Sequence, residues 1–160
     1  MKKILSILLE NEFGSLSRVI GLFSQRGYNI DSISVSPTED TTVSQVTIQT
    51  TVYNLSIIEQ IKKQLKKLIN VLKVTEINKS SYIETEIILI KIEFNKNNMN
   101  SISEINNKFF HNILYQEKNI SIIQITGSSN IINKYLIQIK KVTKILEISR
   151  SGIIGLNLKK

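Results

Sequence analysis

Two spacings of apolar residues alternate along the chain and divide it into expected strands and helices. Residues 2–9 are apolar from Ile4 to Leu9 except at Ser6, which predicts a buried strand. Residues 15–26 then repeat apolar side chains at the i, i+3, i+4, i+7 spacing of an amphipathic helix, at Leu16, Val19, Ile20 and Phe23. Between these segments lies a polar turn, "NEFG", at residues 11–14. A strand therefore leads through a short turn into a helix.

The rest of the first half continues this pattern. Gly27 follows the helix as a stop signal, and two extended segments at 30–35 and 42–50 predict a hairpin. A second amphipathic helix is expected over 55–69, and a fourth strand over 70–77. The order strand, helix, strand, strand, helix, strand is that of the ferredoxin-like βαββαβ fold, in which two helices cover one face of an antiparallel sheet.

The same order recurs in the second half. The expected strands span 86–94, 113–116, 120–126 and 144–152, and the expected helices span 101–110 and a segment that Ser128 or Ser129 caps. We therefore predict an α+β protein of two ferredoxin-like βαββαβ domains. The first domain covers 1–78, a polar linker covers 79–83, and the second domain covers 84–160. Each such sheet leaves one face uncovered, so pairing with a second copy of the chain is expected.

The formal net charge of +8 makes nucleic-acid binding an alternative to consider. The densest group of basic residues lies on the polar side of the helix expected over 55–69, at Lys62, Lys63, Lys66 and Lys67. Arginine, the residue preferred for bidentate phosphate contacts, occurs only at Arg18, Arg26 and Arg150. This distribution favours a solvated basic surface over a polyanion site.

Features that would direct the chain out of the cytoplasm are missing from the sequence. There is no cysteine, which is typical of a reducing compartment. The apolar run in "MKKILSILLE" ends at Glu10, too early for the core of a signal peptide. No apolar run approaches the roughly 18 residues that span a bilayer. We expect a cytoplasmic protein that does not bind membranes.

Constellations of catalytic or metal-ligating residues are also missing. His111 is the only histidine, and its position after two phenylalanines predicts a surface residue at a helix end. Glu84 and Glu86 lie two apart on one strand, where we interpret both as solvated residues rather than as an acid and base pair. We therefore expect no catalytic residues and no metal site in this chain.

The turn at residues 11–14 is the best candidate for binding. Unpaired N–H groups at the start of the following helix favour an anion such as a carboxylate. Gly14 permits close approach of the backbone, and the amide of Asn11 can both donate and accept hydrogen bonds. These groups suit a zwitterionic amino acid, although a purely structural turn has the same composition.

The run "LENEFGSLSRVIGLFSQRGYNI" resembles the start of the small, regulatory subunit of acetolactate synthase, also called acetohydroxyacid synthase. The resemblance continues through "QVTIQT", "IEQIKKQLKKLINVLKV", "EIILIKI" and "RSGIIGL", and so covers nearly the whole chain. It implies an N-terminal ACT domain that forms a homodimer, and a C-terminal domain of similar topology.

The resemblance also implies a role. In this family the large catalytic subunit holds thiamine diphosphate, Mg²⁺ and FAD, and performs the transferase reaction that starts the biosynthesis of the branched-chain amino acids valine, leucine and isoleucine. The small subunit raises that activity and conveys feedback inhibition by valine. This chain is therefore expected to bind the large subunit and to hold no cofactor and no catalytic site of its own.

The family's valine contacts correspond to five residues of this sequence. Asn11, Gly14 and Leu16 would come from one chain, and Asn29 and Ile30 from the partner chain of the dimer. The resemblance thus implies that the turn is one half of a valine site, which the dimer interface completes. An apolar valine side chain would contact Leu16 and Ile30.

Three residues near this site depart from the family pattern and are candidates for modulating it. Phe13 replaces a small residue or proline, Ser34 replaces threonine, and Ser36 replaces alanine or glycine. Because all three lie at the implied ligand site, we expect them to affect valine sensitivity more than activation of the large subunit.

Two other classes of protein use a similar fold. A free-standing ACT-type amino-acid sensor could use the same turn, but a transcriptional version would need a DNA-binding helix pair that the sequence lacks. A nucleic-acid-binding split βαβ protein would place aromatic residues on its central strands. The strand segments "SISVS" and "QVTIQT" contain none.

Overall fold

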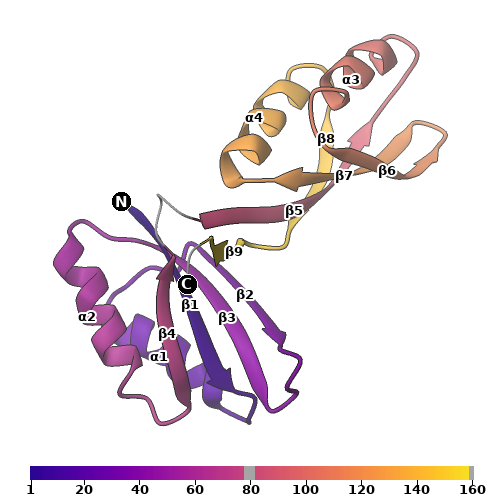
Figure 1. Ribbon diagram of the computed structural model, residues 1–160. Helices are drawn as coiled ribbons and strands as arrows, with labels where there is room; N and C mark the ends of the chain where they lie inside the picture. The colour runs from indigo at the N-terminus through magenta and orange to yellow at the C-terminus, as the bar shows by residue number, and fades with distance from the viewer. Residues whose placement is uncertain (78–81, 159–160) are drawn as a thin grey trace. The chain divides into compact units, whose positions relative to one another are not determined.

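The computed structural model describes residues 1–77 and 82–158, which form two compact units (Figure 1). The first unit contains Met1–Ile83 and the segment that begins at Ile153, and the second contains Glu84–Gly152. Residues 79–81 of the linker predicted over 79–83 lie outside the described residues.

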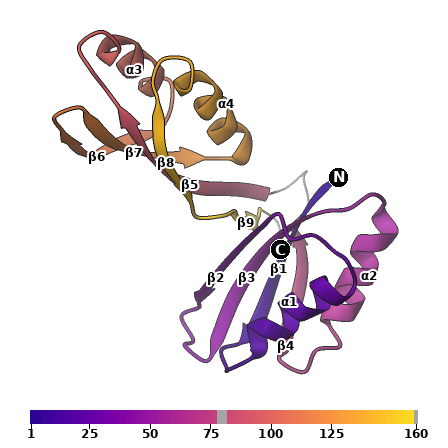
Figure 2. The same ribbon diagram turned by 180° about the vertical axis from the view of Figure 1, so that it is seen from behind.

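The first unit follows the predicted order of elements. These are β1 (Lys2–Glu10), α1 (Ser15–Gln25), β2 (Ser32–Pro37), β3 (Val43–Thr51), α2 (Leu55–Leu65) and β4 (Val71–Ile77). The four strands form an antiparallel sheet in the order β2-β3-β1-β4. Both helices lie on the same face of this sheet, as the two opposite views show (Figures 1 and 2). The prediction of a ferredoxin-like βαββαβ unit is confirmed.

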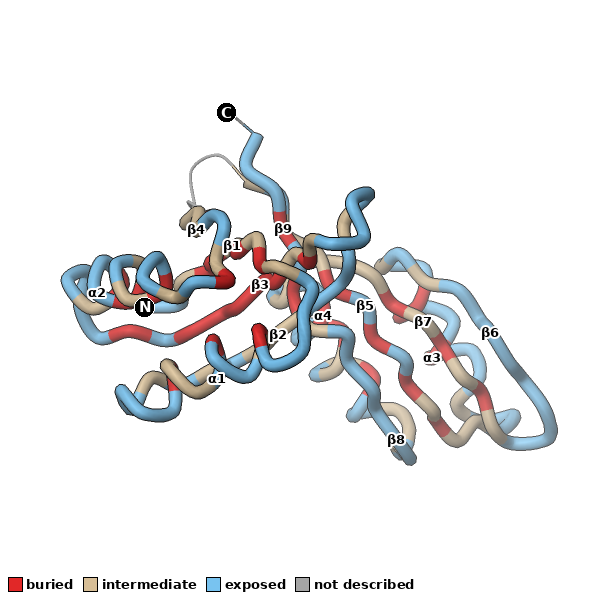
Figure 3. The backbone as a smooth tube through the Cα atoms, turned by 90° about the horizontal axis from the view of Figure 1, so that it is seen from below, coloured by how far each residue is buried: buried red, intermediate tan, exposed pale blue. Residues whose placement is uncertain are grey.

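The core of the first unit lies between the sheet and its two helices. Alternate residues of β1 point toward the helices, and the pairing of Leu5 with Ile48 and of Ile7 with Val46 joins them to β3. Val19 of α1 packs into the same fully buried cluster. Figure 3 shows the consequence, since β3 is buried along most of its length while the outer faces of the helices are exposed.

Helix α2 is shorter than the sequence predicts. Its N-cap is Asn54, whose side chain accepts a hydrogen bond from the Ile57 amide at 3.1 Å. The helix ends at Leu65 rather than at residue 69, because the chain leaves it through tight turns in which Leu68 N donates to Leu65 O at 3.0 Å. Asn70 then leads into β4, and its side chain is buried.

The second unit repeats the architecture. Its elements are β5 (Tyr82–Glu93), which begins at the boundary of the first unit, α3 (Met99–Asn106), β6 (His111–Glu117), β7 (Ile120–Gly127), α4 (Ser129–Ile139) and β8 (Ile145–Arg150). The strands are antiparallel and lie in the order β6-β7-β5-β8. The core side chains of β5 and β7 pack against α4 at Ile88, Ile90, Ile92, Ile123, Ile125, Ile132, Tyr135 and Ile139. The α+β class with two ferredoxin-like domains is therefore confirmed.

Two details of the second unit differ from the prediction. Helix α3 ends at Asn106 instead of residue 110, so His111 does not lie at a helix end. It begins β6 instead, half-buried, with Nδ1 3.2 Å from the carbonyl oxygen of Phe109. Ser128 occupies the N-cap position of α4, as predicted, although its side chain makes no capping hydrogen bond.

A short last strand, β9 (Ile154–Asn157), was not predicted. The segment that begins at Ile153 belongs to the first unit, whereas the sequence interpretation assigned all of 84–160 to the second domain. Ile153 is buried against Ile4 and Ile77, and its amide donates to Ser32 Oγ at 3.0 Å. Four residues are too few to show a strand period in the sequence.

Candidate functional site

At one position of the turn between β1 and α1, the backbone has a conformation that only glycine adopts without strain. Gly14 has φ +82°, in the left-handed region, and a Cβ atom added there would meet nothing within 4 Å. The turn is closed by hydrogen bonds from Glu12 N to Glu10 O at 2.9 Å and from Ser15 N to Glu12 O at 3.2 Å. Among the described residues, no side chain caps α1, so its N-terminus carries a partial positive charge into an open turn.

Asn11 connects this turn to the loop between β2 and β3. Its backbone N–H donates to Thr42 O at 2.7 Å, and its side-chain Nδ2 donates to Thr41 O at 2.9 Å. The loop is itself ordered by Asp40, whose Oδ1 accepts from Thr42 N and Oγ1. The hydrogen bond from the Thr42 side chain lowers the pKa of Asp40 most, and the one from the Thr42 backbone lowers it further. The pKa of Asp40 therefore lies below its ordinary value. Asn11 thus donates two hydrogen bonds to the loop between β2 and β3, one from its backbone and one from its side chain.

The neighbours of the turn differ in exposure. Leu16 is half-buried and packs against the core, whereas Phe13 is fully exposed at the tip of the turn. Ser15, at the first position of α1, is only 2% exposed, and its Oγ is a buried oxygen with no hydrogen-bond partner among the described residues. The burial of Ser15 is not predictable from the sequence, because it follows from the turn and not from a periodic pattern.

Asn29 and Ile30 lie at the opposite end of the sheet from the turn. The carbonyl oxygen of Asn29 accepts from Thr50 Oγ1 at 2.6 Å, and Thr50 pairs with Lys3 at the start of β1. The turn instead follows Glu10, at the end of the strand. Lys3 and Glu10 are about 23 Å apart along β1 at the usual rise per residue of a strand. One chain therefore brings Asn11, Gly14 and Leu16 together but does not bring them to Asn29 and Ile30.

Ser34 and Ser36 lie on β2, at the edge of the sheet. Ser34 pairs with Thr47, and Ser36 pairs with Gln45. Both partners alternate with Val46, which points toward the helices, so the two serines lie on the face away from α1 and α2.

A polar network that the sequence did not predict lies beside the turn. Asn70, which is 7% exposed, donates through Nδ2 to Glu10 Oε2 at 2.8 Å and accepts a hydrogen bond from Arg18 at Oδ1. Its backbone oxygen also accepts from Glu10 N at 2.9 Å. No local signal predicts these contacts, because they join residues 52 and 60 positions apart in the sequence.

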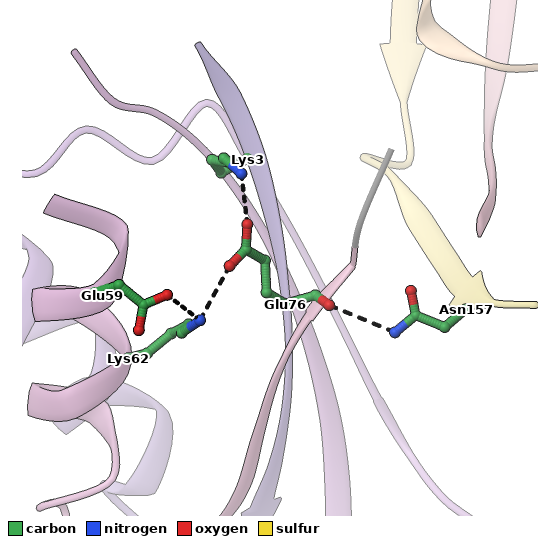
Figure 4. Close-up of polar contacts among 5 residues, drawn as sticks. All are labelled: Lys3, Glu59, Lys62, Glu76 and Asn157. Atoms are coloured by element: carbon green, nitrogen blue, oxygen red, sulfur yellow. Dashed lines mark hydrogen bonds and ion pairs between the residues drawn. The ribbon is translucent and has the colours of Figure 1, made fainter. Parts of the chain in front are cut away.

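A second group of charges lies where β4 meets α2. Glu76 accepts from Lys3 Nζ at 2.6 Å and from Lys62 Nζ at 3.1 Å, and Lys62 also reaches Glu59 (Figure 4). Burial alone would raise the pKa of Glu76, but the two lysines outweigh burial and lower it. The backbone oxygen of Glu76 accepts from Asn157 Nδ2 at 3.5 Å. Lys62 is thus part of a network and not only of a solvated face.

The interpretation of Glu86 as a solvated residue is wrong. Its side chain lies on the helix-facing side of β5 and forms an ion pair with Arg150.

Other polar groups of the second unit are also buried. Burial raises the pKa of Tyr135 above its ordinary value, and the Tyr135 hydroxyl donates to Asn106 Oδ1 at 3.0 Å. His111 lines a small, largely apolar cavity of about 120 Å³ beneath α3. No three metal-binding side chains gather within residues 1–77 and 82–158.

Two family models match successive parts of the chain. Residues 5–73 match the family model described as the AHAS small subunit-like ACT domain. Residues 85–159 match the model described as the small subunit of acetolactate synthase. The chain belongs to the acetolactate synthase small-subunit family.

Individual relatives of the acetolactate synthase small-subunit family align over nearly the full chain. An acetolactate synthase small subunit of Buchnera aphidicola subsp. Baizongia pistaciae is 54% identical over 154 residues, covering 96% of each chain. The acetolactate synthase isozyme 3 small subunit of Escherichia coli is 45% identical over 157 residues, covering 98% of this chain and 96% of that one. The crystal structure of the small subunit from Thermotoga maritima superposes with a TM-score of 0.88 at 32% identity, covering 98% and 97%.

The ACT-domain match contains every residue that the sequence interpretation placed at the ligand site. The family membership confirms the resemblance on which those residues were chosen, whereas their contacts with a ligand remain a prediction. None of the helices within the described residues has the length and hydrophobicity of a membrane span.

Proposed function

We propose that this chain is a regulatory subunit that binds the large catalytic subunit of acetolactate synthase, raises its activity and conveys inhibition by valine. The observation that carries the proposal is the full-length similarity to small subunits of that enzyme, which includes both units of the fold. In this role the thiamine diphosphate, Mg²⁺ and FAD of the reaction belong to the large subunit. This chain contributes binding surfaces and a site for the effector.

The separation of the two halves of the ligand site supports a site shared between two copies. Strand β2 lies at the edge of its sheet, so its outer backbone groups can pair with another strand (Figure 2). Antiparallel pairing of two β2 strands about a twofold axis places the start of one strand beside the end of the other. The partner's Asn29 and Ile30, which precede β2, would then approach the loop after Pro37. Asn11 is hydrogen-bonded to that loop at Thr41 and Thr42.

Each group in this arrangement has a partner in valine. The carboxylate would accept from the N–H groups at the open N-terminus of α1, where Gly14 permits close approach. The ammonium group would donate to Asn11 Oδ1 and to the partner's Asn29. The isopropyl group would contact Leu16 and the partner's Ile30, both of which continue into the apolar core. Fully exposed Phe13 lies at the rim and would control access.

Reconstitution tests the proposed function. Acetolactate formation is measured for the purified chain, for its cognate large subunit, and for the mixture with and without valine. We expect no activity from the chain alone, a rate for the mixture at least threefold above that of the large subunit, and inhibition of the mixture by valine. An equal rate with and without the chain would contradict the role as an activator.

Two further measurements separate the parts of the proposal. Light scattering on a sizing column should give twice the chain mass of 18.3 kDa. Isothermal titration of that dimer with valine should show binding in the absence of the large subunit. Valine binding without any effect on the large subunit would instead support a free-standing amino-acid sensor.

A further inference from the structure

One buried side-chain amide, that of Asn70, joins the two ends of the turn between β1 and α1. Glu10 is the last residue of β1, and Arg18 lies one turn into α1, so Asn11 to Gly14 lie between them. Asn70 contacts both: Nδ2 donates to Glu10 Oε2 at 2.8 Å, and Oδ1 accepts from the Arg18 guanidinium. The backbone of Asn70 also accepts from Glu10 N at 2.9 Å, which fixes Asn70 to β1 independently of its side chain.

The chemistry of the amide suits this position. A carboxylate offers only acceptors and a guanidinium offers only donors, so a group between them must donate on one side and accept on the other. Asn70 does both with a short side chain that is 7% exposed. Because both of its partners are charged, each hydrogen bond is stronger than one between two neutral groups.

We propose that Asn70 is a positioning residue for the amino-acid site, holding the end of β1 and the N-terminus of α1 at the separation that valine requires. This proposal rests on the proposed function, because it concerns the same turn. Asn70 precedes β4 and does not belong to the turn itself. Its substitution is expected to change the geometry of Asn11 and Gly14 without removing a ligand contact.

The first test is the affinity of the full-length dimer for valine, measured by isothermal titration. Asn70→Ala removes both side-chain hydrogen bonds and is expected to weaken binding at least tenfold. Asn106→Ala is the matched control, since Asn106 is a buried asparagine of the second unit that also accepts one side-chain hydrogen bond. It should lower thermal stability while leaving valine affinity within twofold of wild type.

A donor and acceptor exchange distinguishes positioning from simple loss of packing. Asn70→Asp keeps the acceptor for Arg18 but places a second carboxylate against Glu10, so binding should weaken at pH 8 and recover toward pH 5, where the two carboxyl groups share a proton. Adding Glu10→Gln restores a donor opposite Asp and should return affinity to within threefold of wild type at both pH values. The amide resonances of Asn11 and Gly14 in ligand-free protein should shift in Asn70→Ala and return in the double variant.

The outcomes separate the two proposals. If the wild-type dimer binds no valine, the proposed function is contradicted and this inference fails with it. If the wild type binds and folded Asn70→Ala or Asn70→Asp binds equally well, only the positioning role is contradicted. A double variant that folds but stays as weak as Asn70→Asp would also overturn it. Should Asn70→Ala not fold, Asn70→Asp and the double variant decide the question.

Discussion

Arg150 of β8 forms an ion pair with the carboxylate of Glu86, which is only 3% exposed, on the helix-facing side of β5. Arg150 Nε donates to Glu86 Oε2 at 3.1 Å, and a second guanidinium nitrogen reaches Oε1. Arg150 also contacts Asn133 of α4 at 3.5 Å. The pair therefore joins two neighbouring strands to the helix that covers them.

Substitution of Arg150 and substitution of Glu86 should lower the unfolding free energy by different amounts. Arg150→Ala leaves a buried carboxylate without its cation and should cost about 3 kcal/mol of unfolding free energy. Glu86→Gln keeps an acceptor, and the partly exposed Arg150 can turn to water, so its cost should be about 1 kcal/mol. Urea denaturation measures both. Glu147→Gln, on an exposed position of β8, is the control and should change stability little. Equal losses for both variants would contradict this account.

The burial of Glu86 follows from the alternation of residues along β5, although we predicted a solvated residue. Glu86 lies two residues before Ile88, and the alternation that places Ile88, Ile90 and Ile92 in the core places Glu86 on the same face. A charged residue on a buried face implies a partner. The identity of that partner depends on how β5 and β8 are paired, because Arg150 lies opposite Ile88 in the sheet. Arg150 is 64 residues away from Glu86 in the sequence, so no local pattern connects them.

The fold was predictable where a periodic pattern exists and not where a contact depends on tertiary structure. The spacing in β1 and α1 was enough to place both elements and to identify the turn between them. Asn70 belongs to no amphipathic pattern, and the burial of Ile153 depends on the return of the chain to the first unit. The positions of Asn29 and Asn11 at opposite ends of one sheet likewise follow from the strand register, which the sequence does not display.

The Glu76 cluster predicts a dependence of stability on pH. Lys3 and Lys62 lower the pKa of Glu76 in the folded protein despite its burial, so its contribution is complete at neutral pH and is lost as the pH falls below about 4. Glu76→Gln should lower the unfolding free energy by about 1 kcal/mol at pH 7. The difference from wild type should shrink at pH 3.5. Urea denaturation at both pH values measures this effect.

Glu59→Gln is the matched control for that experiment. Glu59 forms an ion pair with Lys62, and its side chain is 55% exposed, so its removal should cost less than about 0.5 kcal/mol. A loss for Glu76→Gln that is the same at pH 7 and pH 3.5 would show that packing, and not charge, explains the role of Glu76.

Substitution of Gly14 by Asp and by Ala should distinguish backbone strain from electrostatic repulsion in the turn between β1 and α1. Both variants place a side chain at φ +82° and should lose about 1 kcal/mol of stability. Only the aspartate adds a negative charge where we propose that the valine carboxylate binds. We therefore expect Gly14→Asp to abolish valine inhibition of the reconstituted enzyme, whereas Gly14→Ala should weaken it less. Equal inhibition of both variants and wild type would place the ligand elsewhere.

Ile153 should stabilise the first unit even though it follows the whole second unit in the sequence. It is 2% exposed and packs against Ile4 and Ile77, whereas the next residue, Ile154, is 51% exposed. Ile153→Ala should cost about 2 to 3 kcal/mol, because the methylene groups that it removes leave a cavity in this small cluster. Ile154→Ala, one position further, should cost less than about 0.5 kcal/mol.

The same cluster predicts how a shortened protein behaves. The fragment of residues 1–78 contains both helices and all four strands of the first sheet, so we expect it to fold and form a dimer. It lacks Ile153, however, which leaves Ile4 and Ile77 exposed to water. Its thermal midpoint should therefore fall below that of the first unit in the full chain, and Ile153→Ala should move the full chain toward the fragment. A fragment as stable as the full-length first unit would mean that the last segment contributes no stability, because burial of Ile153 would then be offset by the cost of ordering it.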